Sequence, residues 1–384
     1  MRKNYKIWAV LGLAAVLGGC TGEQQPTQDT AEINIGQEED GTNGNGNGNG
    51  TDNIEKSINI GLVMSPSGPG DRSLNDATFA GILQAQIEYG ISFSMLQPTN
   101  VADFEIQLHS LAREGVYDLI FMVGGSADQT SALFNVATTY PDQKFSQIDS
   151  TIELPNVSGV QTRWNENMFL TGVMAGLGTK SDMPFAKPES NKVAILIGED
   201  IPLMDKAMIG FEAGARLVNS EAEVFADFIG SFADARRAEE MAIEMFEKGV
   251  DFIQVIGGGA GVGIYMAGSE ADAYVFAAGA NVNFMAPNNI IATAYRDVSG
   301  IILNEISDFV NGRWEAGLHI SGLESGTIGY DRFQSRVEVD EEIEMTIERI
   351  KELVISGELT VPETREELEQ WLNETEIDEL LADI

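Results

Sequence analysis

Hydrophobic and polar residues follow two alternating patterns from residue 57 onward. Short runs such as 57–64 and 192–197 are rich in β-branched residues, which predicts strands. The stretches between such runs, for example 75–89, repeat apolar residues at helical spacing and predict helices. Strands and helices therefore alternate, and this order is typical of α/β domains built on parallel sheets.

The alternation restarts near residue 164, so the sequence predicts two doubly wound lobes with a cleft between them. The expected strands cover residues 57–64, 91–96, 117–123, 144–149, 157–161, 192–197, 224–229, 251–256 and 273–277. The expected helices cover residues 75–89, 103–114, 129–139, 165–178, 203–218, 234–248 and a stretch ending near 269. The acidic segment 336–384 predicts further helices, packed on the outside and without chemistry.

Residues 1–19 have the layout of a lipoprotein signal peptide. Basic residues precede a short apolar run, and the ending Leu17-Gly18-Gly19-Cys20 resembles a lipobox, in which the cysteine is lipidated. An ordinary secretory signal with an incidental cysteine is the alternative, but the chain's single cysteine lies where a lipobox needs it. Residues 20–56 are polar and of low complexity, which predicts a disordered tether from a lipid bilayer to a body outside the cytoplasm.

Composition excludes several classes of function. A formal net charge of −37 over 384 residues disfavours nucleic acid and bare anionic lipid as partners. One cysteine and two histidines leave too few ligands for a disulfide framework or a zinc site. There is no Gly-x-Ser-x-Gly elbow of a hydrolase. We therefore expect no catalytic residues, no metal and no cofactor.

A glycine-rich loop and a capped helix follow the first predicted strand, at residues 68–76. Asp71, Ser73 and Asn75 are short polar residues at the carboxyl end of that strand, where α/β proteins bind ligands. The alternative is a plain turn in which Ser73, Asn75 or Asp76 caps the helix. Gly125 and Ser126 take the equivalent place after strand 117–123.

The glycines from Gly257 to Gly263 fit neither a dinucleotide fingerprint nor a P-loop. They favour close approach of the backbone to a ligand or a neighbouring helix. Gly257 and Gly258 are therefore candidate ligand contacts.

The loop Asp71-Arg72-Ser73-Leu74-Asn75 resembles the Asp-Lys-Ser-Phe-Asn signature of the basic membrane protein family. That family comprises bacterial lipoproteins, among them purine nucleoside receptors of ABC importers. Further matches follow in order at residues 139–149, 156–172, 210–214, 230–234, 257–263 and 278–281. The resemblance implies a type I periplasmic-binding fold with a hinge. We expect residues 57–163 plus 292–316 in one lobe and residues 164–291 plus 317–335 in the other.

The chain departs from the family pattern where the resemblance implies contacts with a nucleoside. Leu74 and Ala207 stand where two stacking aromatic rings are expected, and Asn281 stands where an acid would hold the ribose. The family's lysine is represented by Arg296, which could grip a carbonyl or carboxylate of the ligand. The missing contacts predict purine-nucleoside binding at least about a hundredfold weaker than in the family's dedicated receptors. Trp164 and Phe284 are candidate replacement rings, although both also fit a core or hinge position.

The sequence therefore favours a lipid-anchored solute-binding protein that delivers a small polar ligand, nucleoside-like by resemblance, to an ABC permease. Asp149, at the end of strand 144–149, completes the predicted ligand contacts. A receptor for a signalling partner would have the same fold and is the alternative. A nucleoside-processing enzyme would need a tuned acid or base, which carboxylate-rich composition alone does not reveal.

Overall fold

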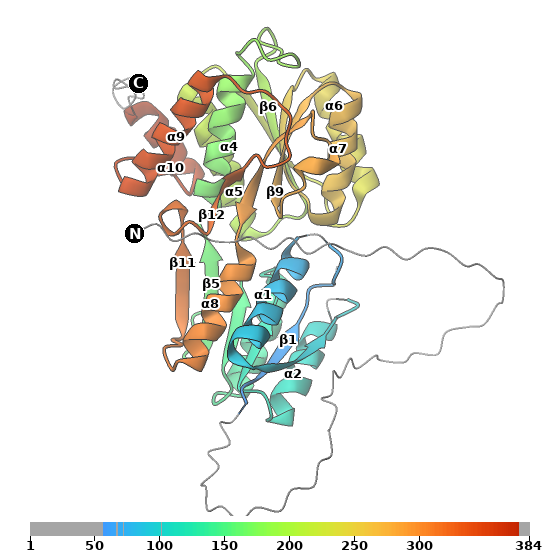
Figure 1. The fold of residues 1–384 in the computed structure, drawn as a ribbon, viewed down its shortest axis with the longest axis vertical. Helices are drawn as coiled ribbons and strands as arrows, with labels where there is room; N and C mark the ends of the chain where they lie inside the picture. The colour runs from blue at the N-terminus through green and yellow to red at the C-terminus, as the bar shows by residue number, and fades with distance from the viewer. Residues whose placement is uncertain (1–56, 67, 72, 101, 376–384) are drawn as a thin grey trace, which may run out of the picture. The chain divides into compact units, whose positions relative to one another are not determined.

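The computed structural model of the chain describes residues 57–375 except 67, 72 and 101, and within them two six-stranded sheets (Figure 1). The first sheet has the strand order β11 (Gly317–Ser321), β5 (Val157–Thr162), β4 (Phe145–Ile148), β3 (Leu119–Met122), β1 (Asn59–Val63) and β2 (Ser92–Leu96). The second has the order β12 (Ile328–Asp331), β10 (Ile290–Arg296), β9 (Tyr274–Gly279), β8 (Phe252–Ile256), β6 (Lys192–Ile197) and β7 (Glu223–Phe228). All neighbours are parallel except β10 and β12.

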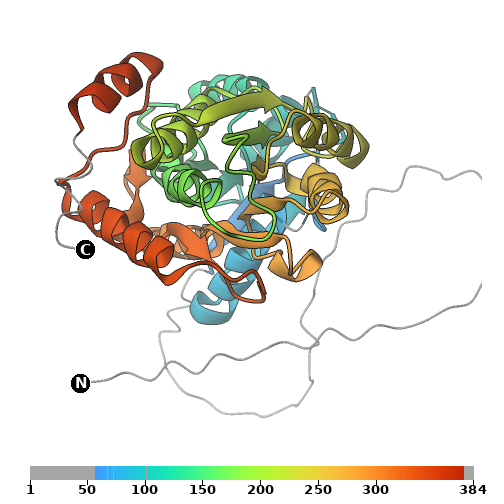
Figure 2. The same cartoon turned by 90° about the horizontal axis from the view of Figure 1, so that it is seen from above.

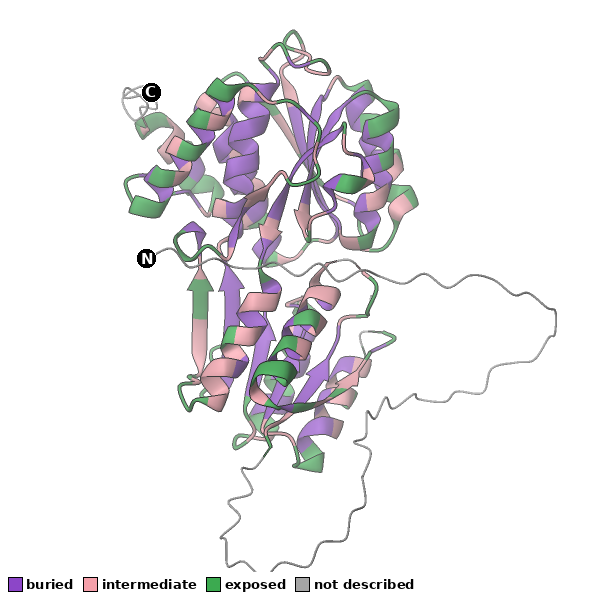
Figure 3. Ribbon diagram, in the orientation of Figure 1, coloured by how far each residue is buried: buried purple, intermediate pink, exposed green. Residues whose placement is uncertain are grey.

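Helices cover both faces of each sheet, which explains why central strands such as β3, β4 and β8 are buried along their whole length (Figure 3). On the first sheet, α1 (Leu74–Tyr89) and α8 (Val298–Val310) cover one face, and α2 (Asp103–Glu114) and α3 (Ala127–Thr139) cover the other. On the second, α4 (Trp164–Gly178) and α5 (Pro202–Val218) lie opposite α6 (Ala235–Glu247) and α7 (Gly261–Glu270). The predicted α/β class and two doubly wound lobes are confirmed.

Two of the predicted lobe boundaries are wrong. β10 pairs with β9 in the second sheet, so residues 292–296 do not belong to the first lobe. β11 pairs with β5 in the first sheet, so residues 317–321 do not belong to the second lobe. Both lie next to a crossing between lobes, and only the distant partner strand decides which sheet each one joins. Within the described residues, the chain passes between the lobes after β5, after β10 and after β11.

Helices α4 and α5 approach each other unusually closely. A Cβ atom added at Gly210 would lie 2.1 Å from the carbonyl oxygen of Asn165, and one at Gly214 would lie 2.1 Å from that of Phe169. From the other helix, a Cβ at Gly172 would lie 2.2 Å from the carbonyl oxygen of Phe211. The block of residues 210–214 therefore serves the packing of two helices, since only hydrogen fits between the backbones.

The C-terminal helices α9 (Glu341–Ser356) and α10 (Arg365–Glu374) lie against the outer side of α4 and α5 (Figures 1 and 2). Leu368 is fully buried, and the ring of Trp371 meets that of Phe169 edge-on, with 6.0 Å between centroids. Thr364 and Glu367 form a capping box that fixes the start of α10. The segment thus completes the core on one side of the second lobe.

A buried carboxylate lies at the amino end of β8. Burial raises the pKa of Asp251 to about 6, although hydrogen bonds from the Lys187 N–H and the Thr179 hydroxyl act in the opposite direction. Because the unfolded chain releases this proton near the ordinary value of 3.8, the folded state binds more protons between about pH 4 and 6. The contribution of Asp251 to stability is therefore present at low pH and lost as the pH rises through 6.

We expect Asp251→Asn to raise the free energy of unfolding by about 1–3 kcal/mol at pH 8 and to leave it unchanged near pH 4. The amide can keep both accepted hydrogen bonds without carrying the charge. Urea unfolding at the two pH values measures the difference, with the exposed Asp182→Asn as the matched control. A gain that is the same at both pH values would contradict the assignment.

Candidate ligand-binding cleft

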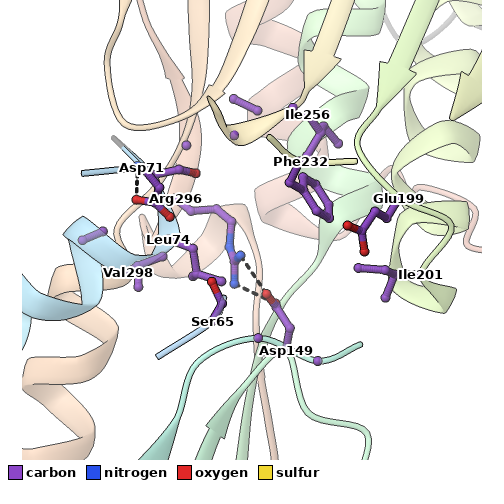
Figure 4. Close-up of a pocket in the computed structure, with 18 of the residues that line it drawn as sticks. Ser65, Asp71, Leu74, Asp149, Glu199, Ile201, Phe232, Ile256, Arg296 and Val298 are labelled. Carbon is purple, nitrogen blue, oxygen red and sulfur yellow. Dashed lines mark hydrogen bonds and ion pairs between the residues drawn. The ribbon is translucent and has the colours of Figure 1, made fainter. Parts of the chain in front are cut away.

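A cavity of about 880 Å³ lies between the two lobes, where the carboxyl ends of strands from both sheets meet (Figure 4). The first lobe contributes residues that follow β1, β3 and β4, and the second contributes residues that follow β6, β8, β9 and β10. This is the place where open α/β sheets hold ligands, and the volume suits a drug-sized molecule. All the predicted ligand contacts line the cavity except Asn75.

Asn75 has a structural role. Its side chain is 1% exposed, donates to the Ser65 hydroxyl at 2.6 Å and to Asp71 at 2.8 Å, and accepts from the Ser65 N–H at 3.0 Å. These contacts fasten the start of α1 to the end of β1. Both ends of the Asn75 amide are bonded within the protein and Asn75 does not line the cavity, so the structure gives no support to its predicted contact with ligand.

The cap of α1 comes from Asp71. Its carboxylate accepts hydrogen bonds from the backbone N–H groups of Ser73 at 2.8 Å, Asn75 at 3.0 Å and Asp76 at 3.2 Å. Ser73 occupies the N-cap position, but its side chain makes no capping bond. The side chain that caps α1 is therefore that of Asp71, and not that of Ser73, Asn75 or Asp76 as the sequence suggested. A Cβ at Gly279, where φ is 98°, would lie 3.2 Å from the Ser73 hydroxyl, so the lobes meet here.

Arg296 is held by Asp149 in a bidentate ion pair. Two guanidinium nitrogens lie 2.8 and 3.1 Å from the two carboxylate oxygens, and the side chains are only 5% and 13% exposed (Figure 4). The guanidinium carbon lies 4.6 Å from the centroid of the Trp164 ring. Asp149 follows β4 in the first lobe, whereas Arg296 ends β10 and Trp164 begins α4 in the second. Asp149, Arg296 and Trp164 therefore join the two lobes beside the crossings that follow β5 and β10. Both terminal nitrogens of Arg296 are bonded to Asp149.

Asn281 is also engaged by the protein. Its amide nitrogen donates to Asp331 at 2.7 Å and to the Phe333 carbonyl at 3.0 Å, while its oxygen accepts from the Asn283 N–H at 3.1 Å. Asp331 itself lines the cavity. The resemblance implied an acid at position 281. The carboxylate found there belongs instead to Asp331, at the end of β12, which is bonded to Asn281.

Close backbone approach explains most of the predicted glycines. A Cβ at Gly125 would lie 1.9 Å from the carbonyl oxygen of Asp149, so only glycine fits there. Ser126 next to it caps α3, and its hydroxyl accepts from the Gln129 N–H at 3.3 Å. The loop of Gly257 and Gly258 packs on the loop that carries Phe232, whose carbonyl accepts from the Ala260 N–H at 3.0 Å.

Phe232, Glu199 and Ile201 form a wall of the cavity that sequence reasoning missed (Figure 4). The ring of Phe232 packs directly on the α-carbon of Gly198, where an added Cβ would lie 2.2 Å from a ring carbon. A signal was present, since residues 198–201 follow β6 and the block 230–234 follows β7 at the same sheet edge. Ala207, the expected site of a missing ring, is fully buried and does not line the cavity.

The two candidate replacement rings differ in position. Trp164 lines the cavity but is only 6% exposed, because the guanidinium of Arg296 packs on one face of its ring. Phe284 is 53% exposed and lies outside the lining. Among the described residues, no group of three or more His, Cys, Asp or Glu side chains could hold a metal ion.

Comparisons with known proteins place this two-lobed fold in a family. Residues 58–365 match the model of the Bmp family, described as ABC transporter substrate-binding protein PnrA-like. The chain belongs to this family. It is 27% identical over 312 residues to basic membrane protein A1 of Borrelia garinii subsp. bavariensis. That alignment covers 79% of this chain and 88% of the relative. It is 28% identical over 287 residues to an uncharacterized lipoprotein of Pyrococcus horikoshii, covering 72% and 69% of the two chains.

Solved structures agree on the fold of this family member. An ABC transporter solute-binding protein of Aeropyrum pernix aligns with a TM-score of 0.71 and 24% identity, over 85% of this chain and 98% of that one. A solute-binding protein of Conexibacter woesei aligns with a TM-score of 0.61 and 21% identity, over 80% and 99%. At these identities the likeness shows the two-lobed fold alone. The family is a class of substrate-binding proteins rather than enzymes.

Proposed function

We propose that this member of the Bmp family captures a small polar, nucleoside-like ligand between its lobes and delivers it to an ABC permease. The observation that carries the proposal is the cavity of about 880 Å³, walled by both lobes at the carboxyl ends of their strands. Rotation of the lobes about the three crossings would close this cavity on a ligand, as in other two-lobed binding proteins.

Calorimetry with adenosine, guanosine and inosine tests the ligand class directly. Leu74 lines the cavity without a ring, but Phe232 supplies an aromatic face from the second lobe (Figure 4). We therefore expect one stacking contact in place of two and affinities about tenfold or more below those of a site with two rings. Equal or tighter binding than such a site would contradict this expectation. Mass spectrometry of small molecules released from the denatured protein is the independent check, and an empty cleft combined with no binding would count against the proposed function.

We further propose that Cys20 carries the lipid anchor and holds the protein on the outer side of a cell membrane. Cys20 lies outside the described residues, and the support is its sequence context. Among the described residues, no helix is long and apolar enough to cross a membrane.

The anchor predicts a clear result for one substitution. Cys20→Ser should move the protein from the membrane fraction to the soluble fraction or leave the precursor uncleaved, since the thiol is the only acceptor for the lipid. Incorporation of labelled palmitate measures the modification. Label retained by the variant would show that the lipid is attached elsewhere.

A further inference from the structure

The cleft offers a ligand no free positive charge among its described residues. Arg296 is the one described cation in the lining, and its two terminal nitrogens are bonded to Asp149. The bidentate bonds to Asp149 use two of the five N–H donors of the guanidinium and compensate its charge, so an anionic ligand that reached the remaining donors would meet an ion pair without net charge. The expectation that Arg296 grips an acidic group of the ligand is therefore not supported by this geometry.

Negative charge, in contrast, surrounds the cavity. The carboxylates of the described lining are Asp71, Asp128, Asp149, Glu199, Asp297 and Asp331. Asp149 is paired with Arg296, whereas the hydrogen bonds that Asp71, Asp297 and Asp331 accept come from neutral donors. Several uncompensated negative charges on the walls of one cleft produce a negative potential inside it.

Glu199 is the carboxylate best placed to act on a ligand. It follows β6 at the carboxyl edge of the second sheet, is partly buried, and forms no hydrogen bond or ion pair within the described part of the chain. Phe232 stands beside it, with its ring packed on the neighbouring Gly198 (Figure 4). An aromatic face next to a free carboxylate is the combination that attracts an organic cation, because both present negative electrostatic potential.

We propose that the ligand of this cleft carries a positive charge, and that Glu199 and Phe232 bind the charged group. The proposal rests on the solute-binding function and narrows it to organic cations, such as a protonated amine or a cationic heterocycle. Ser73 and Leu74 of the first lobe, together with Trp164, provide polar and apolar contacts for the rest of the molecule. Anions, including phosphorylated nucleosides, are rejected by the field of the cleft.

Three probes that share one skeleton and differ in charge test the proposal. Adenosine is neutral, 1-methyladenosine is cationic at neutral pH, and adenosine 5′-monophosphate is anionic. Titration calorimetry on the full-length protein should give about tenfold tighter binding of the cation than of adenosine, and no binding of the anion. Glu199→Gln should remove most of the preference for the cation and bring the ratio of the two affinities close to one. Glu189→Gln, which makes the same change beyond the amino end of β6, should alter neither.

Each other outcome has a defined meaning. Adenosine or its monophosphate binding as tightly as the cation overturns the proposal, as does an unchanged preference in Glu199→Gln. If none of the three probes binds, mass spectrometry of the molecule released from the purified protein decides: a neutral or anionic molecule overturns the cation proposal and leaves solute binding in place, whereas a cationic one supports both. If no molecule is bound or released, the solute-binding function itself fails.

Discussion

Replacing Arg296 by methionine is expected to lower the free energy of unfolding by about 3–5 kcal/mol. The substitution leaves the carboxylate of Asp149 almost buried without its cation, and it removes the group that packs on Trp164. A buried charge without a partner costs far more than the pair contributes, since desolvation is no longer offset. Urea unfolding of the wild type and the variant measures the loss.

Two further variants separate the buried charge from other effects. Adding Asp149→Asn to Arg296→Met should recover about 1–2 kcal/mol, because it removes the unpaired charge. Asparagine tolerates the positive φ of 61° at this position. Arg313→Met breaks the exposed pair with Asp308 and should cost no more than about 1 kcal/mol. If Arg296→Met lowered the free energy of unfolding as little as Arg313→Met, the ion pair between Arg296 and Asp149 would contribute little to stability.

Gly210→Ala is expected to destabilise the second lobe by about 3 kcal/mol, the upper end of the usual cost of overpacking. The new methyl group would lie 2.1 Å from the carbonyl oxygen of Asn165 and 2.6 Å from its α-carbon. These atoms belong to the backbone of α4, so relief requires the two helices to move apart. Thermal unfolding followed by circular dichroism measures the change.

Gly259→Ala is the matched control, since it adds the same methyl group where the nearest atom is 3.6 Å away. We expect its stability to be equal to or slightly above that of the wild type, because alanine restricts the unfolded chain. If both variants behaved alike, close packing of α4 and α5 would not be the reason for glycine at position 210.

Most elements could be predicted from local patterns, because their signals are local. The helices at 103–114 and 165–178 and the strand at 192–197 agree with α2, α4 and β6 to within one residue. The edges of the sheets could not be assigned in this way. β10 and β11 both lie near a crossing, and their hydrogen-bond partners are set by the three-dimensional course of the chain.

The candidate site shows the same division. Gly125 and Asp71 were identified because each follows a strand at the carboxyl edge, which is visible in the sequence. The pairing of Arg296 with Asp149 joins residues 147 positions apart, and no local pattern encodes it. Ala207 was assigned by resemblance alone, and the aromatic wall came instead from Phe232, on a loop whose position depends on packing against Gly198.

The placement of β11 has a consequence for how the protein is made. The first lobe obtains its edge strand from residues 317–321 and one of its covering helices from residues 298–310, after the entire second lobe except β12 and the C-terminal helices has been synthesised. A nascent chain therefore cannot complete either lobe early, and the contacts it needs are separated by more than 150 residues. Such long-range closure slows folding and prolongs the exposure of apolar strands. We infer that neither lobe completes its core until nearly all of the chain has left the ribosome, and that β5 lacks its outer neighbour for most of synthesis.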